Sequence, residues 1–181
     1  MSTRSTISIH QKDGNIRTVY CHFDGYYEHN GVILYNFYNT SEKVNALIDN
    51  GAISSLGTII GKKHDFYGVH HDCTFYHRDR GEKKEIWESK IYEGENPYKH
   101  LLKDNEDFNY IFVEKTGEWL VNNWDEEYEK LEEAFRKKAD FNVWMILVNN
   151  QEQYQKLLNF YKEFGHPDMK IPDFKEVVYE V

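Results

Sequence analysis

Two stretches in the first half of the chain carry most of the side chains that can do chemistry. Residues 20–31, YCHFDGYYEHNG, hold one cysteine, two histidines, two acids and three tyrosines. Residues 62–84 hold four more histidines among six lysines and arginines, with aromatic residues between them. Histidine and carboxylate side chains bind metals or act as acids and bases, and basic groups beside aromatic rings are typical of RNA contacts. These residue types suggest a metal site, a metal-free catalytic centre or an RNA-binding surface.

A metal site would draw its ligands from both stretches. His22, Asp24 and His29 supply groups suited to Zn²⁺ or to the divalent ion of a nuclease. The residues that would complete the set are His70, His71, Asp72 and His77. These spacings match no compact ligand motif, and neither HExxH nor a zinc ribbon is present. The alternative is a structural turn in which these side chains bind backbone groups. The sequence favours the turn and predicts no metal or cofactor.

Residues 62–84 suggest metal-free chemistry on RNA. His77 is the candidate catalytic residue, because histidine acts as acid or base near neutral pH. The candidates for contact with RNA phosphates are Arg78, Arg80, Lys83 and Lys84. The competing interpretation is a solvated β-hairpin of mixed charge, since Asp79, Glu82 and Glu85 dilute the patch. Serine-hydrolase, P-loop and Rossmann motifs are absent, so the sequence leans away from an enzyme.

The charge of the chain is divided unevenly. Residues 1–100 contain 12 Lys/Arg and 13 Asp/Glu, whereas residues 101–181 contain 10 and 18. Five glutamates are predicted to share about two helical turns and to bind a basic partner: Glu126, Glu127, Glu129, Glu132 and Glu133. An ordinary exposed amphipathic helix is the alternative. The total charge of −9 argues against tight binding of free nucleic acid and favours a basic protein partner.

Hydrophobic periodicity predicts an α+β fold. An N-terminal β-hairpin is expected over 4–22, because Asp13-Gly14 separates two alternating runs. Two short helices are expected next, over 32–38 and from Thr40 to Gly51. Antiparallel strands packed with two longer helices should follow: strands over 73–79 and 85–92, a hairpin over 109–123, a helix from Asp125, a buried strand over 141–149 and a helix over 154–164.

These elements allow two domain arrangements. One consists of a hairpin-plus-helices module over 1–60 and an acidic α+β module over 61–181, and the other is a single continuous domain. Cys21 and Cys73 form no CxxC pair, which favours free thiols in a reducing compartment. The sequence has no apolar run long enough to span a bilayer and no signal-peptide pattern, so a cytoplasmic location is predicted.

The opening of the chain resembles a family of small proteins from phages and mobile elements of gut and Firmicute bacteria. The residues that carry the resemblance are the TRS strand at Thr3 to Ser5, the YCHxDGYxEHNG pattern at Tyr20 to Gly31, the YN pair at Tyr38-Asn39 and the SSLG at Ser54 to Gly57. The resemblance covers about the first third of the chain, and residues 60–181 match no pattern of the family.

Proteins of this size and origin include anti-CRISPR inhibitors of type II-A systems. The resemblance therefore implies an inhibitor that binds Cas9, or Cas9 with its guide RNA, in the host bacterial cell. It leaves open whether guide RNA is also truncated, and it assigns no catalytic residue. A metal- or histidine-dependent nuclease or hydrolase is the alternative function that the two histidine-bearing stretches suggest.

Overall fold

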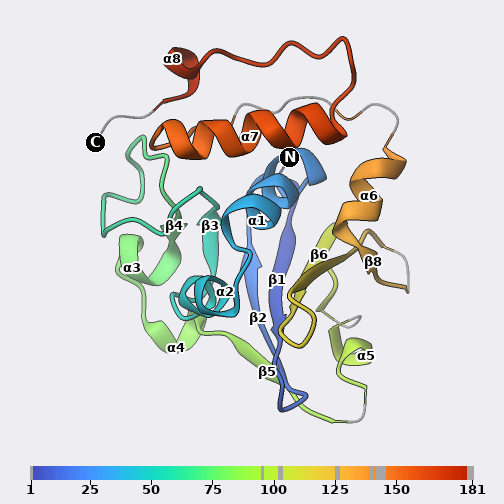
Figure 1. Cartoon of the computed structure of the whole chain (residues 1–181). Helices are drawn as coiled ribbons and strands as arrows, with labels where there is room; N and C mark the ends of the chain where they lie inside the picture. Colours follow the sequence, from blue (N-terminus) through green and yellow to red (C-terminus); the bar gives the residue numbers. More distant parts are fainter. Residues whose placement is uncertain are drawn as a thin grey trace.

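The computed structural model describes residues 2–94, 96–101, 104–124, 127–138, 141 and 146–178. Within these residues the chain forms an α+β fold around one eight-stranded sheet, as Figure 1 shows. The strand order is β4-β3-β2-β1-β6-β7-β8, and β5 also pairs with β2. The fold class predicted from the sequence is confirmed.

The predicted N-terminal hairpin lies at the centre of the sheet. β1 (Ser5–His10) and β2 (Ile16–Cys21) pair antiparallel, and Gly14 in their turn has a φ of +93°. β6 (Phe108–Val113) lies parallel to β1 and forms the second predicted hairpin with β7 (Glu118–Asn122). Strands that lie about a hundred residues apart in the chain therefore share one sheet.

One face of the sheet carries the main hydrophobic core. Ile7 and Ile9 of β1 are fully buried there, among side chains from α1 (Val32–Phe37), α2 (Ser41–Ile48) and α7 (Gln151–Phe164). Figure 1 shows α1 and α2 in front of the strands and α7 across one end of the sheet. These three helices confirm the helix predictions for the corresponding parts of the sequence.

The opposite face of the sheet is polar near its centre. Alternate residues of a strand point to opposite faces, so Thr6 and Ser8 lie behind the buried isoleucines. Thr6 Oγ1 donates to Asn109 Oδ1 over 2.8 Å, and Ser8 Oγ lies 2.7 Å from Thr18 Oγ1. A second small hydrophobic cluster covers part of this face, and its buried members are Ile16, Leu101 and Ile111.

The remaining elements are short. They are the π-helix η1 (Tyr27–Gly31), β3 (Ile53–Ser55), β4 (Thr74–Phe75), α3 (Tyr76–Arg80), α4 (Lys84–Trp87), β5 (Lys90–Tyr92), α5 (Tyr98–Leu101), β8 (Glu129–Lys130), α6 (Leu131–Lys137) and α8 (Phe174–Val177). None of the helices described here has the length and apolar character that a membrane crossing requires. Both cysteines are buried free thiols.

The predicted hairpin over 73–92 is wrong. β4 ends after two residues and the chain turns into α3, while α4 precedes the three residues of β5. Asp79 explains the difference, because its carboxylate accepts from the backbone N–H of Phe75 over 2.7 Å and so closes a helical turn. Gly81, with a φ of +76°, then ends α3.

The predicted helix from Asp125 is also wrong in its first turn. Residues 125–126 lie outside the described residues, and Glu129–Lys130 forms β8 against β7 before α6 begins at Leu131. The ion pair from Lys130 to Glu118, at 3.0 Å, stabilises this strand pairing. The buried strand expected over 141–149 lies partly outside the described residues. Its described part forms an isolated bridge between Val148 and Val178.

A buried amide joins η1 to the hairpin. The Asn30 side chain is fully buried, and its Nδ2 donates to Ser5 Oγ at 3.2 Å, Cys21 Sγ at 3.4 Å and the Phe23 carbonyl at 3.1 Å. Its Oδ1 lies 2.8 Å from His29 Nδ1. The Asn30 side chain therefore ties η1 to β1, to the end of β2 and to the turn that follows.

We expect Asn30→Ala to lower the free energy of unfolding by about 2–4 kcal/mol, because it leaves several buried polar groups without partners. Asn36→Ala is the matched control, since Asn36 Nδ2 donates one hydrogen bond, to the Val32 carbonyl. It should cost less than about 1 kcal/mol. Urea unfolding followed by circular dichroism measures both variants, and equal losses would show that the Asn30 network does not anchor η1.

Candidate functional site

Arg78, predicted to contact RNA, is half-buried and bonded to the protein on several sides. Its Nε donates to Asp79 Oδ1 over 2.9 Å. Its two terminal nitrogens donate to the carbonyls of Ile60, Gly61 and Cys73 over 2.8 to 3.1 Å. Four hydrogen bonds thus hold the guanidinium, three of them to carbonyls of the loop that precedes β4. The Arg78 side chain is 15% exposed and organises the basic segment through these contacts.

Asp79 is the anionic partner in this arrangement. Its side chain is fully buried and also accepts from the backbone N–H groups of Phe75 and His64, over 2.7 and 3.1 Å. Burial alone would raise the pKa of the Asp79 carboxyl. The hydrogen bonds from Arg78 and from the two backbone groups outweigh that effect and hold the pKa below its ordinary value.

Arg80, by contrast, extends along the surface between aromatic rings. Its guanidinium carbon lies 4.9 Å from the centre of the Phe66 ring and 4.7 Å from that of Tyr76. Tyr76 stacks on Trp87, with ring centres 4.5 Å apart. Glu82 accepts from both Arg80 and Trp87 Nε1. We call Phe66, Tyr76, Arg80 and Trp87 the aromatic shelf.

Four lysines surround the aromatic shelf in sequence, and all four are exposed: Lys62, Lys63, Lys83 and Lys84. Within the described part of the chain none of them forms an ion pair. Three exposed hydrophobic residues extend the same segment: Tyr67 is 81% exposed, Val69 82% and Ile86 66%. The segment thus combines free cationic groups with accessible apolar surface.

His77, the candidate catalytic residue, lies on α3 next to Arg78. Its Nδ1 lies 2.5 Å from the Glu82 carbonyl, which can only accept, so Nδ1 carries the proton of this hydrogen bond. An acid–base role would therefore depend on Nε2. Glu82 links His77 to the aromatic shelf. Its carbonyl accepts from His77 Nδ1, and its carboxylate accepts from Arg80 and from Trp87 Nε1.

The predicted acidic cluster is divided among different elements. Glu129 belongs to β8 and pairs with Lys137, while Glu132 belongs to α6 and pairs with Arg136 over 2.9 Å. Glu133 also lies on α6, Glu127 precedes β8 and both are exposed, and Glu126 lies outside the described residues. The glutamates therefore do not form one continuous helical face.

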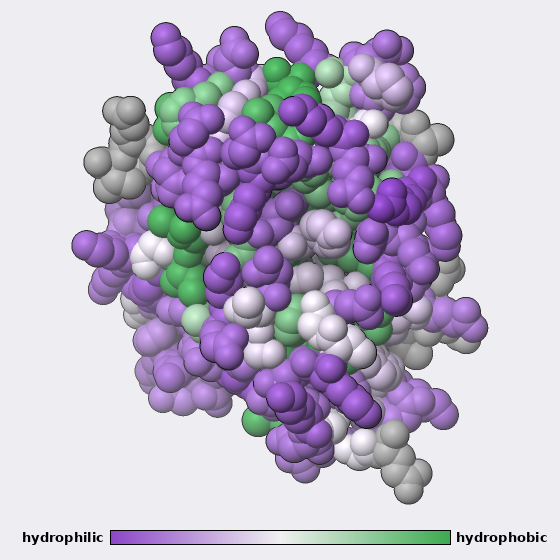
Figure 2. All heavy atoms as spheres, viewed as in Figure 1, coloured by the Kyte–Doolittle hydropathy of each residue, from purple (hydrophilic) through white to green (hydrophobic). Residues whose placement is uncertain are grey.

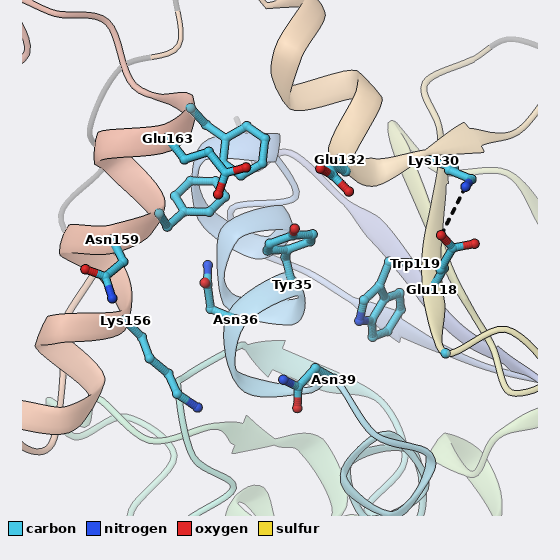
Figure 3. Close-up of a pocket in the computed structure, with 13 residues that line it drawn as sticks. Tyr35, Asn36, Asn39, Glu118, Trp119, Lys130, Glu132, Lys156, Asn159 and Glu163 are labelled. Atoms are coloured by element: carbon cyan, nitrogen blue, oxygen red, sulfur yellow. Dashed lines mark ion pairs between the residues drawn. The ribbon is translucent and has the colours of Figure 1, made fainter.

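A groove of about 580 Å³ opens beside this acidic region (Figure 3). Tyr35 from α1 and Trp119 from β7 point into it, facing Asn159 and Lys156 of α7. Glu132 lies on its rim. Figure 2 shows the face of the molecule seen in Figure 1, where hydrophilic residues surround paler and hydrophobic areas.

The groove rim is braced by ion pairs. Arg136 of α6 contacts Glu132 at 2.9 Å and Glu163 of α7 at 2.8 Å. The Lys130–Glu118 pair, dashed in Figure 3, lies on the other wall. Sequence reasoning missed Glu118 and Glu163, because they join the acidic region only through tertiary contacts. These side chains give the groove a rim that is charged and largely paired.

The stretch 20–31 meets residues 70–72 at a separate, smaller cavity of about 170 Å³. The chemically active residues that line it are Asp24, His29, His70, His71 and Asp72. His22, which the sequence grouped with them, is not among its lining residues and hydrogen-bonds to the Tyr20 hydroxyl over 2.6 Å. Among the described residues, no three histidine, cysteine or acidic side chains are placed to hold a metal ion.

Searches of protein-family models, curated proteins and solved structures found no match to this chain. Its function therefore has to be inferred from its own residues.

We expect Arg78→Ala and Arg80→Ala to differ sharply in stability. Loss of Arg78 leaves the buried Asp79 carboxylate without its cation and should cost about 3–5 kcal/mol. Loss of the exposed Arg80 should cost less than about 1 kcal/mol. Chemical unfolding followed by tryptophan fluorescence distinguishes the two. A similar cost for both variants would contradict the assignment of Arg78 as the internal arginine.

Proposed function

We propose that this protein is a phage or mobile-element inhibitor that binds Cas9 loaded with guide RNA in the host cytoplasm. In this proposal the aromatic shelf and its four lysines contact the guide RNA, and the acidic region around α6 contacts basic surface of Cas9. The proposal combines the resemblance of the first third of the chain with the geometry of residues 62–87.

The observation that carries the proposal is the set of unpaired lysines around the aromatic shelf. Lysines without acidic partners can replace the counterions of RNA phosphates, which makes binding favourable and dependent on salt. Phe66 and Trp87, the half-buried rings of the aromatic shelf, offer flat surfaces on which unpaired bases stack, whereas Tyr76 is buried between Arg80 and Trp87. Phosphate contacts and stacking together suit single-stranded parts of an RNA better than a duplex.

The negative charge of the remainder of the protein opposes binding of free RNA by these lysines alone. A net charge of −9 repels free RNA, so the RNA contact should need Cas9 to present the guide. The exposed Glu127 and Glu133 have no ion-pair partner among the described residues, so both are available to a basic protein surface. Cas9 holds its guide RNA in a positively charged channel, which fits this charge distribution.

Size-exclusion chromatography with the Cas9–guide RNA complex tests the proposal. Wild-type protein should co-elute at low salt and dissociate as the salt concentration rises. Replacing Lys62, Lys63, Lys83 and Lys84 by alanine should weaken binding by roughly tenfold or more and flatten the salt dependence.

The matched control replaces four exposed lysines elsewhere, namely Lys43, Lys162, Lys170 and Lys175, by alanine. It removes the same charge and should bind more tightly than the first variant. Failure of the wild-type protein to co-elute at low salt, with Cas9 enzymes from the expected hosts, would overturn the proposal. Equal weakening by both variants would show that the lysines around the aromatic shelf have no specific role in binding.

A metal- or histidine-dependent nuclease or hydrolase is the second candidate function. It is favoured by the cavity that brings Asp24, His29, His71 and Asp72 together. It ranks second because the described residues contain no trio of ligands around one metal position.

A further inference from the structure

The groove of about 580 Å³ beside α7 has the size of a small-molecule binding site. Tyr35 and Asn36 of α1 and the following Asn39 line it across from α7, together with Trp119 of β7 (Figure 3). The residues that α7 contributes lie three or four positions apart, so they share one helical face: Lys156, Asn159, Phe160, Glu163 and Phe164. The groove thus combines buried aromatic rings with charged and amide side chains.

The Lys156 ammonium gives the groove a positive charge. It forms no ion pair among the described residues, whereas the ammonium of Lys130 contacts Glu118 at 3.0 Å. Figure 3 shows the Lys156 side chain extending from α7 toward Asn39. The side chain is half-buried, so a carboxylate that enters the groove meets a cation that is partly shielded from water.

The other end of the α7 face carries negative charge. Arg136 contacts two carboxylates there, of Glu132 at 2.9 Å and of Glu163 at 2.8 Å. One net negative charge remains among these three groups. Glu163 lies seven residues after Lys156, which is two helical turns and about 10 Å along the axis. The groove therefore has a positive end and a negative end.

The wall formed by α1 and the residues after it offers uncharged hydrogen-bonding groups. Asn36 Nδ2 donates to the Val32 carbonyl over 2.8 Å, which leaves its Oδ1 to accept from a ligand. The exposed Asn39 amide has no hydrogen bond to the described residues, so it can both donate and accept. Amide groups of this kind match the N–H and C=O groups of a peptide backbone.

Tyr35 adds a hydroxyl on a ring that is held in place. Its ring centre lies 5.4 to 6.0 Å from those of Phe135, Phe160 and Phe164. The hydroxyl has no hydrogen-bond partner among the described residues. Burial raises the pKa of Tyr35, and the nearby glutamates add to this effect, so the hydroxyl stays protonated and can donate.

We propose that this groove binds a short zwitterionic peptide of two or three residues, with its carboxylate at Lys156 and its ammonium group at the carboxylates that share Arg136. An extended chain spans about 3.3–3.6 Å per residue, so three residues cover the distance between the two charged ends. The amides of Asn36 and Asn39 then bond to the peptide backbone. The negative end of the groove disfavours a polyanion such as RNA.

This site is independent of the Cas9 proposal. The glutamates that the Cas9 proposal uses, Glu127 and Glu133, do not line the groove, and neither do the lysines around the aromatic shelf. Loss of peptide binding and loss of Cas9 binding are therefore separate outcomes, measured with different variants.

Nuclear magnetic resonance of the isotope-labelled full-length protein tests the proposal with the tripeptide Ala-Leu-Ala. The tripeptide should produce saturable shifts of the Asn39 side-chain amide resonances at pH 7 and constant ionic strength. Acetylating its amino terminus or amidating its carboxyl terminus removes one charge, and each change should weaken binding by roughly tenfold. Acetylated peptide that binds as tightly as the free one would overturn the proposal and would assign the groove to the carboxyl terminus of a protein.

Lys156→Gln should weaken binding of Ala-Leu-Ala by roughly tenfold or more. Lys162→Gln is the matched control, because Lys162 is exposed on α7, does not line the groove and should leave binding unchanged. Asn39→Ala replaces the first variant if that variant does not fold, and it should also weaken binding. The absence of any saturable shift in the wild-type protein, or equal binding by the Lys156 and Lys162 variants, would contradict the proposal.

Discussion

The position of the turn at residues 22–31 depends on the buried side chain of Asn30. Its amide contacts β1, the end of β2 and the turn that follows, and its oxygen orients His29. A second buried contact supports the same turn, because the Tyr110 hydroxyl of β6 donates to the Gly25 carbonyl over 2.7 Å. The turn at residues 22–31 is thus fixed by both the N-terminal hairpin and a strand from the second half of the chain. Once it is fixed, α1 can cover the sheet and the small cavity can form beside His29.

The Arg78–Asp79 pair determines the conformation of the basic segment. Arg78 pairs with Asp79 inside the protein, and Asp79 turns the chain into α3. Arg80 then lies on the aromatic rings, and the lysines are exposed to solvent. The same buried contacts that stabilise the segment therefore decide which of its charges are available to a partner. A surface built in this way is rigid at its base, which lowers the entropic cost of binding.

Local sequence patterns correctly predicted the helices and hairpins that are determined by residues close together in the sequence. Asp13-Gly14 between two alternating runs identified the first hairpin, and the spacing of Leu157 and Tyr161 identified α7. The parallel pairing of β1 with β6 could not be predicted, because it joins residues about a hundred positions apart through backbone hydrogen bonds. The error at α3 has a similar cause. A charged stretch favours a solvated turn, unless a side chain such as Asp79 is buried and bonds to the backbone.

The candidate sites were predictable to different degrees. Composition pointed to residues 62–84 but could not separate Arg78 from Arg80, since their roles differ only in what each guanidinium contacts. The acidic cluster appeared continuous in the sequence because the intervening strand β8 was not foreseen. His29 and Asp72 come together only when the loops on either side of Gly57 and Gly61 pack, a contact that no local pattern encodes.

The central claim is that residues 62–87 contact guide RNA held by Cas9. Photo-cross-linking of a complex assembled with 4-thiouridine-containing guide, followed by peptide mapping, tests it most directly. The account predicts cross-links to peptides that contain Phe66, Tyr67 or Trp87, and none when Cas9 is omitted. Cross-links confined to other parts of the chain, or efficient cross-linking to free guide RNA, would contradict it.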